Sequence, residues 1–369
     1  MHECISLLWS LDGANGKRGQ AFIFYYSLLL QLLLLLMLLL LAAATSPKAM
    51  SKSSLKLYWL LLCLFTSQAQ AWHDETYADE PAADEEQLLV QFQLGYEQWE
   101  RQCEPYEKQA EPAVSTRIAR GQLAEPGMFP FQAGLLLQLR NGSYRQCGGS
   151  LISLSFVLTA AHCLKDVASG VVYLGSNNYA VAATAAERFE VQTQQFIIYP
   201  GYLGFGGYND LALIQLPKQA QRTAKVQPIR LAQRFMRQSY LQGQLVSSAG
   251  WGALGDGKAE RQSLEPTAED NLLHYVDVQV MEQQRCICYF LPGLVSAHRH
   301  ICTDGRGGRG ACDGDSGGPL VYQWRNVSYL IGLTTFGTAE GCELNGPTVY
   351  TRLTAYLEWI SAEMGLHVH

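Results

Sequence analysis

Three short motifs, in a fixed order along the chain, constrain its fold more than any other feature of the sequence. They read TAAHC at 159–163, NDLALI at 209–214 and CDGDSGGP at 312–319. Hydrolysis of an amide needs a nucleophile, a base with a pKa near neutrality and a carboxylate that fixes the tautomer of the base. Ser316, His162 and Asp210 are residues of these three types, so the motifs predict a site for nucleophilic hydrolysis.

The order of the motifs separates two arrangements of such a triad. GDSGG at 314–318 also matches the loose Gly-x-Ser-x-Gly turn of α/β-hydrolases, in which the acid and then the histidine follow the serine. Here no aspartate follows Ser316, and the only later histidines are His367 and His369 at the tail. The order His, Asp, Ser is the one used on the chymotrypsin fold.

On these motifs, residues 118–369 resemble the trypsin/chymotrypsin family of serine proteases. The resemblance implies an all-β fold of two six-stranded antiparallel β-barrels, with the active site in the cleft between them. A C-terminal helix is expected from apolar residues at helical spacing between Leu353 and Met364. The implied activity is that of a serine endopeptidase acting on proteins or peptides.

The resemblance assigns the catalytic roles to His162, Asp210 and Ser316. It places the oxyanion hole at the backbone N–H groups of Gly314 and Ser316, and such donors lower the barrier by about 3 kcal/mol each. All three catalytic residue types are present, which favours an active enzyme over the alternative, a non-catalytic homologue that binds or regulates.

The sequence from Arg117 to Gly121 resembles the activation junction of the family, although Ala119 and Arg120 depart from its usual residues. Cleavage after Arg117 would free the amine of Ile118, which in the family pairs with the aspartate before the nucleophile, here Asp315. A buried ion pair contributes only with good geometry, so it is suited to a switch. We therefore expect a zymogen, an activating protease of trypsin-like specificity, and serine protease inhibitors as further partners.

The resemblance also places the substrate pocket. Its residues are Gly310 at the base, Gly337 and Thr348 on the walls, Phe336 in place of the usual Trp, and Thr335 in place of the usual Ser behind Asp210. An uncharged residue at the bottom of the pocket predicts poor binding of Arg or Lys side chains, because an unpaired buried cation is costly. Thr348 adds volume, so small or medium apolar side chains are expected, with aromatic side chains as the alternative.

Seven of the ten cysteines follow Ile118. By resemblance Cys147 pairs with Cys163 and Cys312 with Cys342, while Cys302 pairs with Cys288 or, as the alternative, with Cys286. The remaining member of the Cys-Ile-Cys pair would then bond Cys103 and hold the preceding segment to the catalytic domain. No cofactor and no metal are expected, because residues 298–300 read as an exposed loop without a third ligand and Ser176 replaces the glutamate of the family's calcium loop.

Two apolar stretches precede the catalytic domain. Residues 50–71 have basic residues, a short apolar core and an Ala-Gln-Ala site, which together predict a signal peptide and secretion. Residues 1–49 then form an apolar N-terminal extension. In the alternative interpretation 21–44 is a signal-anchor helix, long enough to cross a bilayer, and the protein is a membrane-tethered processing protease.

Charge is unevenly spread along the chain, whose net charge is −6. Residues 72–117 hold 12 acidic and 3 basic residues, and their composition predicts a propeptide that is disordered or loosely helical. Residues 118–369 hold 19 of each sign, so no basic surface for nucleic acid is evident. Glycosylation sequons at Asn141 and Asn326, with the cysteines, indicate an oxidising compartment.

Overall fold

The computed structural model describes residues 85–107, 121–178, 185–204, 207–253, 272–338, 341–342 and 345–365. The chain divides into two compact units, the first ending at Tyr96 and the second running from Glu97 to the end. The stretches 1–49 and 50–71, together with Arg117 and Ile118, lie outside the described residues. None of the described helices is both long and apolar enough to cross a membrane.

The strands are β1 (Gln122–Leu123), β2 (Gln132–Leu139), β3 (Tyr144–Ser153), β4 (Phe156–Thr159), β5 (Val167–Leu174), β6 (Glu187–Gln192), β7 (Phe196–Ile198), β8 (Ala212–Gln215), β9 (Arg230–Leu231), β10 (Leu245–Gly250), β11 (His274–Gln279), β12 (His300–Thr303), β13 (Pro319–Trp324), β14 (Val327–Phe336) and β15 (Thr348–Arg352). The helices are α4 (Glu85–Glu107), α5 (Ala161–Leu164), α6 (Gln238–Leu241), α7 (Gln283–Ile287) and α8 (Leu357–Glu363), with 3₁₀ turns η4 (Thr193–Gln195) and η5 (Leu353–Ala355).

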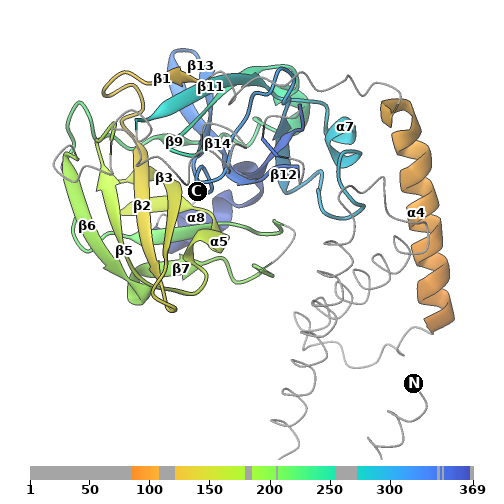
Figure 1. Cartoon of the computed structure of the whole chain (residues 1–369), viewed down its shortest axis with the longest axis horizontal. Coiled ribbons are helices and arrows are strands. Elements are labelled where there is room, and N and C mark those ends of the chain that lie inside the picture. Colours follow the sequence, from red (N-terminus) through yellow and green to blue (C-terminus); the bar gives the residue numbers. More distant parts are fainter. Residues whose placement is uncertain are drawn as a thin grey trace, which may run out of the picture. The chain divides into compact units, whose positions relative to one another are not determined.

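These strands form two curled sheets that lie side by side in the second unit (Figure 1). One has seven strands in the order β6-β5-β2-β3-β4-β8-β7, and the other has eight, with the path β1-β11-β10-β13-β14-β15-β12 and β9 beside β14. All pairs are antiparallel except β9 with β14. The predicted all-β chymotrypsin-like class is therefore confirmed, and the strands beyond six per sheet are short ones of two or three residues.

The concave faces of the two sheets share one apolar core. The burial of β6 alternates residue by residue, as expected for a strand with one face in the core. Phe189 and Val191 are its inward residues, and Leu135, Leu213 and Leu320 come from strands β2, β8 and β13. Burying each such side chain stabilises the fold by roughly 1.5–3 kcal/mol.

The two sheets meet where β3 passes the loop that carries Ser316. The N–H of Gly148 donates to the carbonyl oxygen of Ser316 over 2.7 Å. A Cβ on Gly148 would lie 2.8 Å from the Cα of Gly318, so only glycine allows this approach. The hydroxyl of Thr159 donates to the carbonyl of Gly148 over 2.8 Å. The serine loop is thereby fastened to the opposite sheet.

The predicted C-terminal helix is present as α8, and it packs on the segment that precedes Asp210. Ile360 is fully buried, and the ring of Trp359 lies 5.2 Å from that of Tyr199 between centroids. The hydroxyl of Tyr356, at the start of the helix, donates to Oδ1 of Asn209 over 2.9 Å. The last helix thus supports the acid of the site as well as the core.

Of the two states expected for the acidic segment, disordered or loosely helical, residues 85–107 adopt the helical one and form the continuous helix α4. Glu, Gln and Leu dominate it, and these residues lose little side-chain freedom in a helix. In the second unit Cys103 is buried and bonded to Cys288, which restrains the helix from outside. The predicted bond between Cys103 and one member of the Cys-Ile-Cys pair is confirmed, whereas the weak periodicity of the sequence did not indicate a continuous helix.

His300 corrects an expectation, because this member of the supposed exposed loop is fully buried at the start of β12. Its Nδ1 accepts a hydrogen bond from the N–H of Ser296 over 2.9 Å, and its Nε2 donates to the carbonyl of Gly207 over 3.0 Å. The imidazole is therefore neutral with the proton on Nε2. Burial is the main cause that lowers the pKa of His300.

We expect the folded protein to lose stability in acid through His300. The unfolded chain binds a proton near pH 6.5, the ordinary pKa, whereas the folded chain does so only at lower pH. The contribution of His300 to the free energy of unfolding should therefore fall as pH drops below about 6.5. Urea unfolding at pH 7.5 and 5.0 checks this, and in His300→Gln the fall between these two values should be smaller. Equal falls in both proteins would contradict the assignment.

Candidate active site

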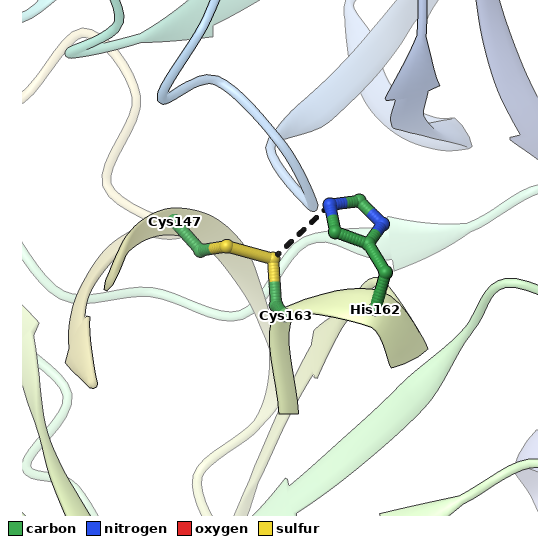
Figure 2. A group of neighbouring side chains, drawn as sticks. All are labelled: Cys147, His162 and Cys163. Carbon is green, nitrogen blue, oxygen red and sulfur yellow. Dashed lines mark hydrogen bonds between the residues drawn. A yellow bond between two sulfur atoms is a disulfide. The ribbon is translucent and has the colours of Figure 1, made fainter. Parts of the chain in front are cut away.

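His162 lies on α5, the short helix that follows strand β4. Its neighbours Ala161 and Cys163 are buried, and Cys163 is bonded to Cys147 on β3. Figure 2 shows the imidazole beside this disulfide, with Nε2 3.8 Å from Sγ of Cys163. The Nη1 group of Arg145 donates a hydrogen bond to the carbonyl of His162 over 2.7 Å. The backbone of the histidine is thus held by a disulfide and by a cation at the end of the helix.

The histidine and the aspartate form a close pair. Nδ1 of His162 lies 2.7 Å from Oδ2 of Asp210, and the N–H of His162 donates to Oδ1 over 2.8 Å. The side chain of Asp210 is 2% exposed, whereas that of His162 is 31% exposed. A carboxylate accepts hydrogen bonds, so the Nδ1–H form is favoured and the lone pair of Nε2 stays free to accept a proton. This is the tautomer that a general base needs.

Asp210 is held from behind by hydroxyl groups. Thr351 Oγ1 donates to the carbonyl of Asp210 over 3.0 Å, and it lies 2.9 Å from the hydroxyl of Thr335. Thr335 is thereby linked to Asp210 through Thr351 and the backbone carbonyl rather than through the carboxylate. No motif in the sequence pointed to Thr351. Asn209 is at φ 55°, a conformation in which Asn is common, and it was also not identified.

Ser316 reaches this pair from the other sheet, in the loop before β13. The Sγ of Cys163 lies 3.6 Å from the carbonyl oxygen of Ser316 and 3.8 Å from Nε2 of His162. Within the described residues the hydroxyl of Ser316 is not hydrogen bonded to His162, so the structure brings the loop to the site without closing that bond. Catalytic hydrogen bonds are often long in proteins without substrate.

Cys147, His162 and Cys163 offer donor atoms within 4.8 Å of one another, a spacing that metal sites also use (Figure 2). The two sulfur atoms are joined in a disulfide. Metal ligation by cysteine requires a thiolate, so these three residues do not form a metal site in this oxidised state.

Asp315 is directed away from the triad, into a small cavity. Its Oδ1 accepts from the N–H of Gly252 over 2.7 Å, and its Oδ2 accepts from the N–H of Cys312 over 2.9 Å. Burial raises the pKa of Asp315 to about 6, although these two donors oppose the rise. Its hydrogen-bond partners here are backbone amides, which carry no full charge.

The cavity beside Asp315 measures about 320 Å³ when its open mouth is included, and Gly121, His274 and Gly310 contribute to its lining. A Cβ on Gly250 would lie 2.0 Å from Oδ1 of Asp315. This glycine is therefore required for the carboxylate to approach the backbone of the second sheet. The cavity reaches Gly121, the first described residue after the activation junction.

The predicted pocket residues gather at the ends of β14 and β15. A Cβ on Gly310 would lie 2.6 Å from Oγ1 of Thr348, so the expected base and wall are direct neighbours. Phe336 pairs with Val349 across the sheet. Gly337 is exposed, and a Cβ there would meet nothing within 4 Å. Thr335 is buried behind Asp210 rather than in the pocket.

The described residues contain four disulfides, and for Cys302 the preferred partner is wrong while the alternative is confirmed. Cys302 bonds Cys286, not Cys288, and Cys288 bonds Cys103. The pairs Cys147–Cys163 and Cys312–Cys342 are as expected. The correction has a local cause: Cys286 is fully buried on α7 facing β12, whereas Cys288 follows the helix end, where it meets Cys103.

Both glycosylation sequons lie on exposed hairpin turns. Asn141 is in the turn between β2 and β3, where its Oδ1 accepts from the N–H of Ser143 over 3.0 Å. Asn326 is in the turn between β13 and β14, at φ 60°. Both side chains are therefore accessible, as a glycan acceptor must be.

Comparison with known proteins agrees with this geometry. The chain is 35% identical over 251 residues to a collagenase from Hypoderma lineatum, covering 68% of this chain and 88% of the relative. It is 34% identical over 249 residues to brachyurin from Leptuca pugilator, covering 68% and 99%. A solved structure of HL collagenase matches with a TM-score of 0.57 and 33% identity, covering 68% of this chain and all of the other.

The family model for trypsin matches residues 118–360, the segment that contains both sheets, the His162–Asp210 pair and the Ser316 loop. The chain belongs to the trypsin family and is a chymotrypsin-like serine endopeptidase.

Proposed function

We propose that the protein is a secreted endopeptidase made as a zymogen, which hydrolyses peptide bonds through His162, Asp210 and Ser316. The observation that carries this proposal is the double contact between His162 and the buried Asp210 carboxylate. It leaves Nε2 as the only basic nitrogen of the ring, on the side where the Ser316 loop arrives. The N-terminal stretch 50–71 supports secretion, because it reads as a signal peptide.

The chemical steps follow from these positions. Ser316 Oγ attacks the scissile carbonyl while Nε2 of His162 takes its proton, and Asp210 stabilises the resulting imidazolium. The N–H groups of Gly314 and Ser316 stabilise the oxyanion, and neither has a hydrogen-bond acceptor among the described residues. His162 then protonates the departing amine, and water releases the acyl group by the reverse sequence.

We propose that cleavage after Arg117 switches the enzyme on through Asp315. The raised pKa of the Asp315 carboxyl shows the cost of burying it without a cation. The new ammonium group of Ile118, three residues before Gly121, would enter the adjoining cavity and supply that cation. The activator is a protease of trypsin-like specificity, since the bond follows Arg. Serine protease inhibitors that occupy the same cleft are the other expected partners.

We propose that the pocket accepts small or medium apolar side chains at P1, the substrate residue before the cleaved bond. Its supporting features are the absence of charge at Gly310 and the position of Thr348 directly beside it. A charged P1 side chain would be buried without a partner. The volume of Thr348 penalises Tyr and Trp, since about 1–3 kcal/mol separates substrates that differ by one methylene in such a pocket.

A P1-varied peptide library, tested on protein activated at Arg117, should show cleavage after Leu, Met or Ala. Thr348→Gly should shift the preference toward Phe and Tyr by about tenfold, because it removes volume beside Gly310. The matched control is Gly337→Ala, which adds one methyl in open space at the mouth. Preferred cleavage after Arg or Lys by the wild type would overturn the charge argument.

A further inference from the structure

Two disulfides meet in one short segment beside the proposed substrate pocket. Cys286 and Cys288 are separated by one residue, yet they bond different parts of the chain. Cys286 is fixed to Cys302 on β12, and Cys288 is fixed to Cys103, which precedes the activation junction. The second bond spans 185 residues of sequence and passes over Arg117. Cleavage after Arg117 therefore leaves Cys103 attached to the catalytic domain.

The segment around Cys103 also makes polar contacts with the start of α7. The hydroxyl of Tyr106 donates to Oε1 of Glu282 over 2.9 Å, and Nε2 of Gln284 donates to Oε1 of Gln102 over 3.3 Å. The hydrogen bond with Glu282 raises the pKa of the Tyr106 hydroxyl. Cys103 itself is 2% exposed. The disulfide is thus one of several contacts between this segment and the start of α7, because residues on both sides of Cys103 also form hydrogen bonds there.

From Cys288 the chain leads directly to the pocket wall. The N–H of Phe290 donates to the carbonyl of Ile287 over 3.3 Å, so a tight turn fixes Phe290 relative to Cys288. The ring of Phe290 is 8% exposed and meets the ring of Phe336 edge to face, with centroids 5.4 Å apart. Both rings belong to a small cluster that also holds Cys286. Aromatic pairs of this geometry favour one relative position.

Phe336 is held on its other sides as well. A Cβ on Gly207 would lie 2.4 Å from its ring, and the imidazole of His300 lies edge to face at 6.0 Å. Its cross-strand partner Val349 follows Thr348, the proposed pocket wall. Because packed side chains transmit displacements, a shift of Phe290 should move Phe336 relative to the pocket.

We propose that Cys103 is a positioning residue for the substrate pocket. After activation the cleaved segment stays as a covalently bound second chain, and its disulfide to Cys288 holds Phe290 against Phe336. This inference rests on the proposed function, because it takes Phe336 as part of the pocket. A wall residue contacts the substrate side chain rather than the reacting atoms, so the tether acts on KM and leaves kcat nearly unchanged.

The test is the double variant Cys103→Ser/Cys288→Ser, which leaves no free thiol, activated at Arg117 and compared with wild type. KM should rise about 5- to 10-fold for peptides with Leu or Phe at P1, since displacements below 1 Å weaken such contacts, and kcat should stay within about twofold. Phe290→Ala should give a similar rise, and the triple variant should add little, because both changes act through one contact. The matched control is Gln102→Ala/Tyr106→Phe, which keeps the disulfide and should keep the KM.

Amide hydrogen exchange provides a readout that does not depend on activity. In the double variant, exchange should accelerate at residues 289–294 and at Phe336, and the control should match wild type. If activated wild type cleaves no peptide, the proposed function fails. The exchange data alone then decide whether the Cys103–Cys288 disulfide holds Phe336 in position. Unchanged exchange at Phe336 overturns the proposal. So does a fall in melting temperature with unchanged KM, which would make the tether merely structural.

Discussion

Ser316→Ala should lower kcat by about 10⁴- to 10⁶-fold while the protein still folds. The hydroxyl makes no hydrogen bond among the described residues, so its loss leaves no buried partner unsatisfied. The loop is held instead by its backbone, through the bond from the N–H of Gly148 to the carbonyl of Ser316. Peptide hydrolysis after activation at Arg117, together with thermal unfolding, measures both effects.

Asp210→Asn provides a second, independent test of the same mechanism. The variant keeps the shape of the side chain but offers an amide to Nδ1 of His162, which favours the wrong tautomer of the ring. We expect a loss of about 10⁴-fold, of the same kind as in Ser316→Ala. Near-wild-type rates in either variant would refute the assigned mechanism, because that mechanism requires both the Ser316 hydroxyl and the Asp210 carboxylate.

The sequence was sufficient for the fold class and for the spatial meeting of its motifs. The family resemblance that the motifs carry placed His162 and Asp210 in one site, where they are in contact. The glycine-rich loop around Ser316 is held by the bond from Gly148 on β3, which was not predicted. These features are local, since each motif carries both the reactive side chain and the small residues that its loop requires. Short motifs of this kind therefore predict positions well.

Two features of the structure could not be predicted from the motifs because they depend on tertiary contacts. Cys286 and Cys288 are both compatible with a bond to Cys302, and only the direction of α7 decides between them. The indirect support of Asp210 by Thr335 through Thr351 likewise depends on the register of β14 against β15. Neither a helix direction nor a strand register is encoded in residue spacing alone.

The continuous helix of residues 85–107 is a further feature that local sequence patterns do not predict. Its composition is acidic and weakly periodic, which favours disorder in isolation. In the second unit its end is fixed by the bond from Cys103 to Cys288 and by the contact of Tyr106 with Glu282. A restraint between residues 185 apart lowers the entropy of the free chain, an effect that no local window can detect.

Asp315→Asn should abolish activation and also change how stability depends on pH. The carboxyl has a pKa of about 6 in the folded protein, above its ordinary value of 3.8, so the folded state binds more protons between these values. Through this group the free energy of unfolding of the precursor should therefore rise by about 1.4 kcal/mol as pH falls from 8 to 5, about half of the roughly 3 kcal/mol that the whole shift contributes below pH 3.8. The contribution of His300 has the opposite sign. The wild type and Asp315→Asn share this contribution, so it cancels in the difference between their free energies of unfolding.

After cleavage at Arg117 the ammonium group of Ile118 should pair with Asp315, so the wild type gains stability at pH 8 and the Asn variant does not. Removing one partner of a buried ion pair costs about 3–5 kcal/mol, which corresponds to a loss of about 10²- to 10⁴-fold in the active population. Arg117→Gln is the matched variant, because it keeps Asp315 but blocks the cleavage. Mass analysis of the new N-terminus must accompany the assay, since cleavage at Arg120 would remove Ile118. Full activity in Asp315→Asn cleaved at Arg117 would show that the switch lies elsewhere.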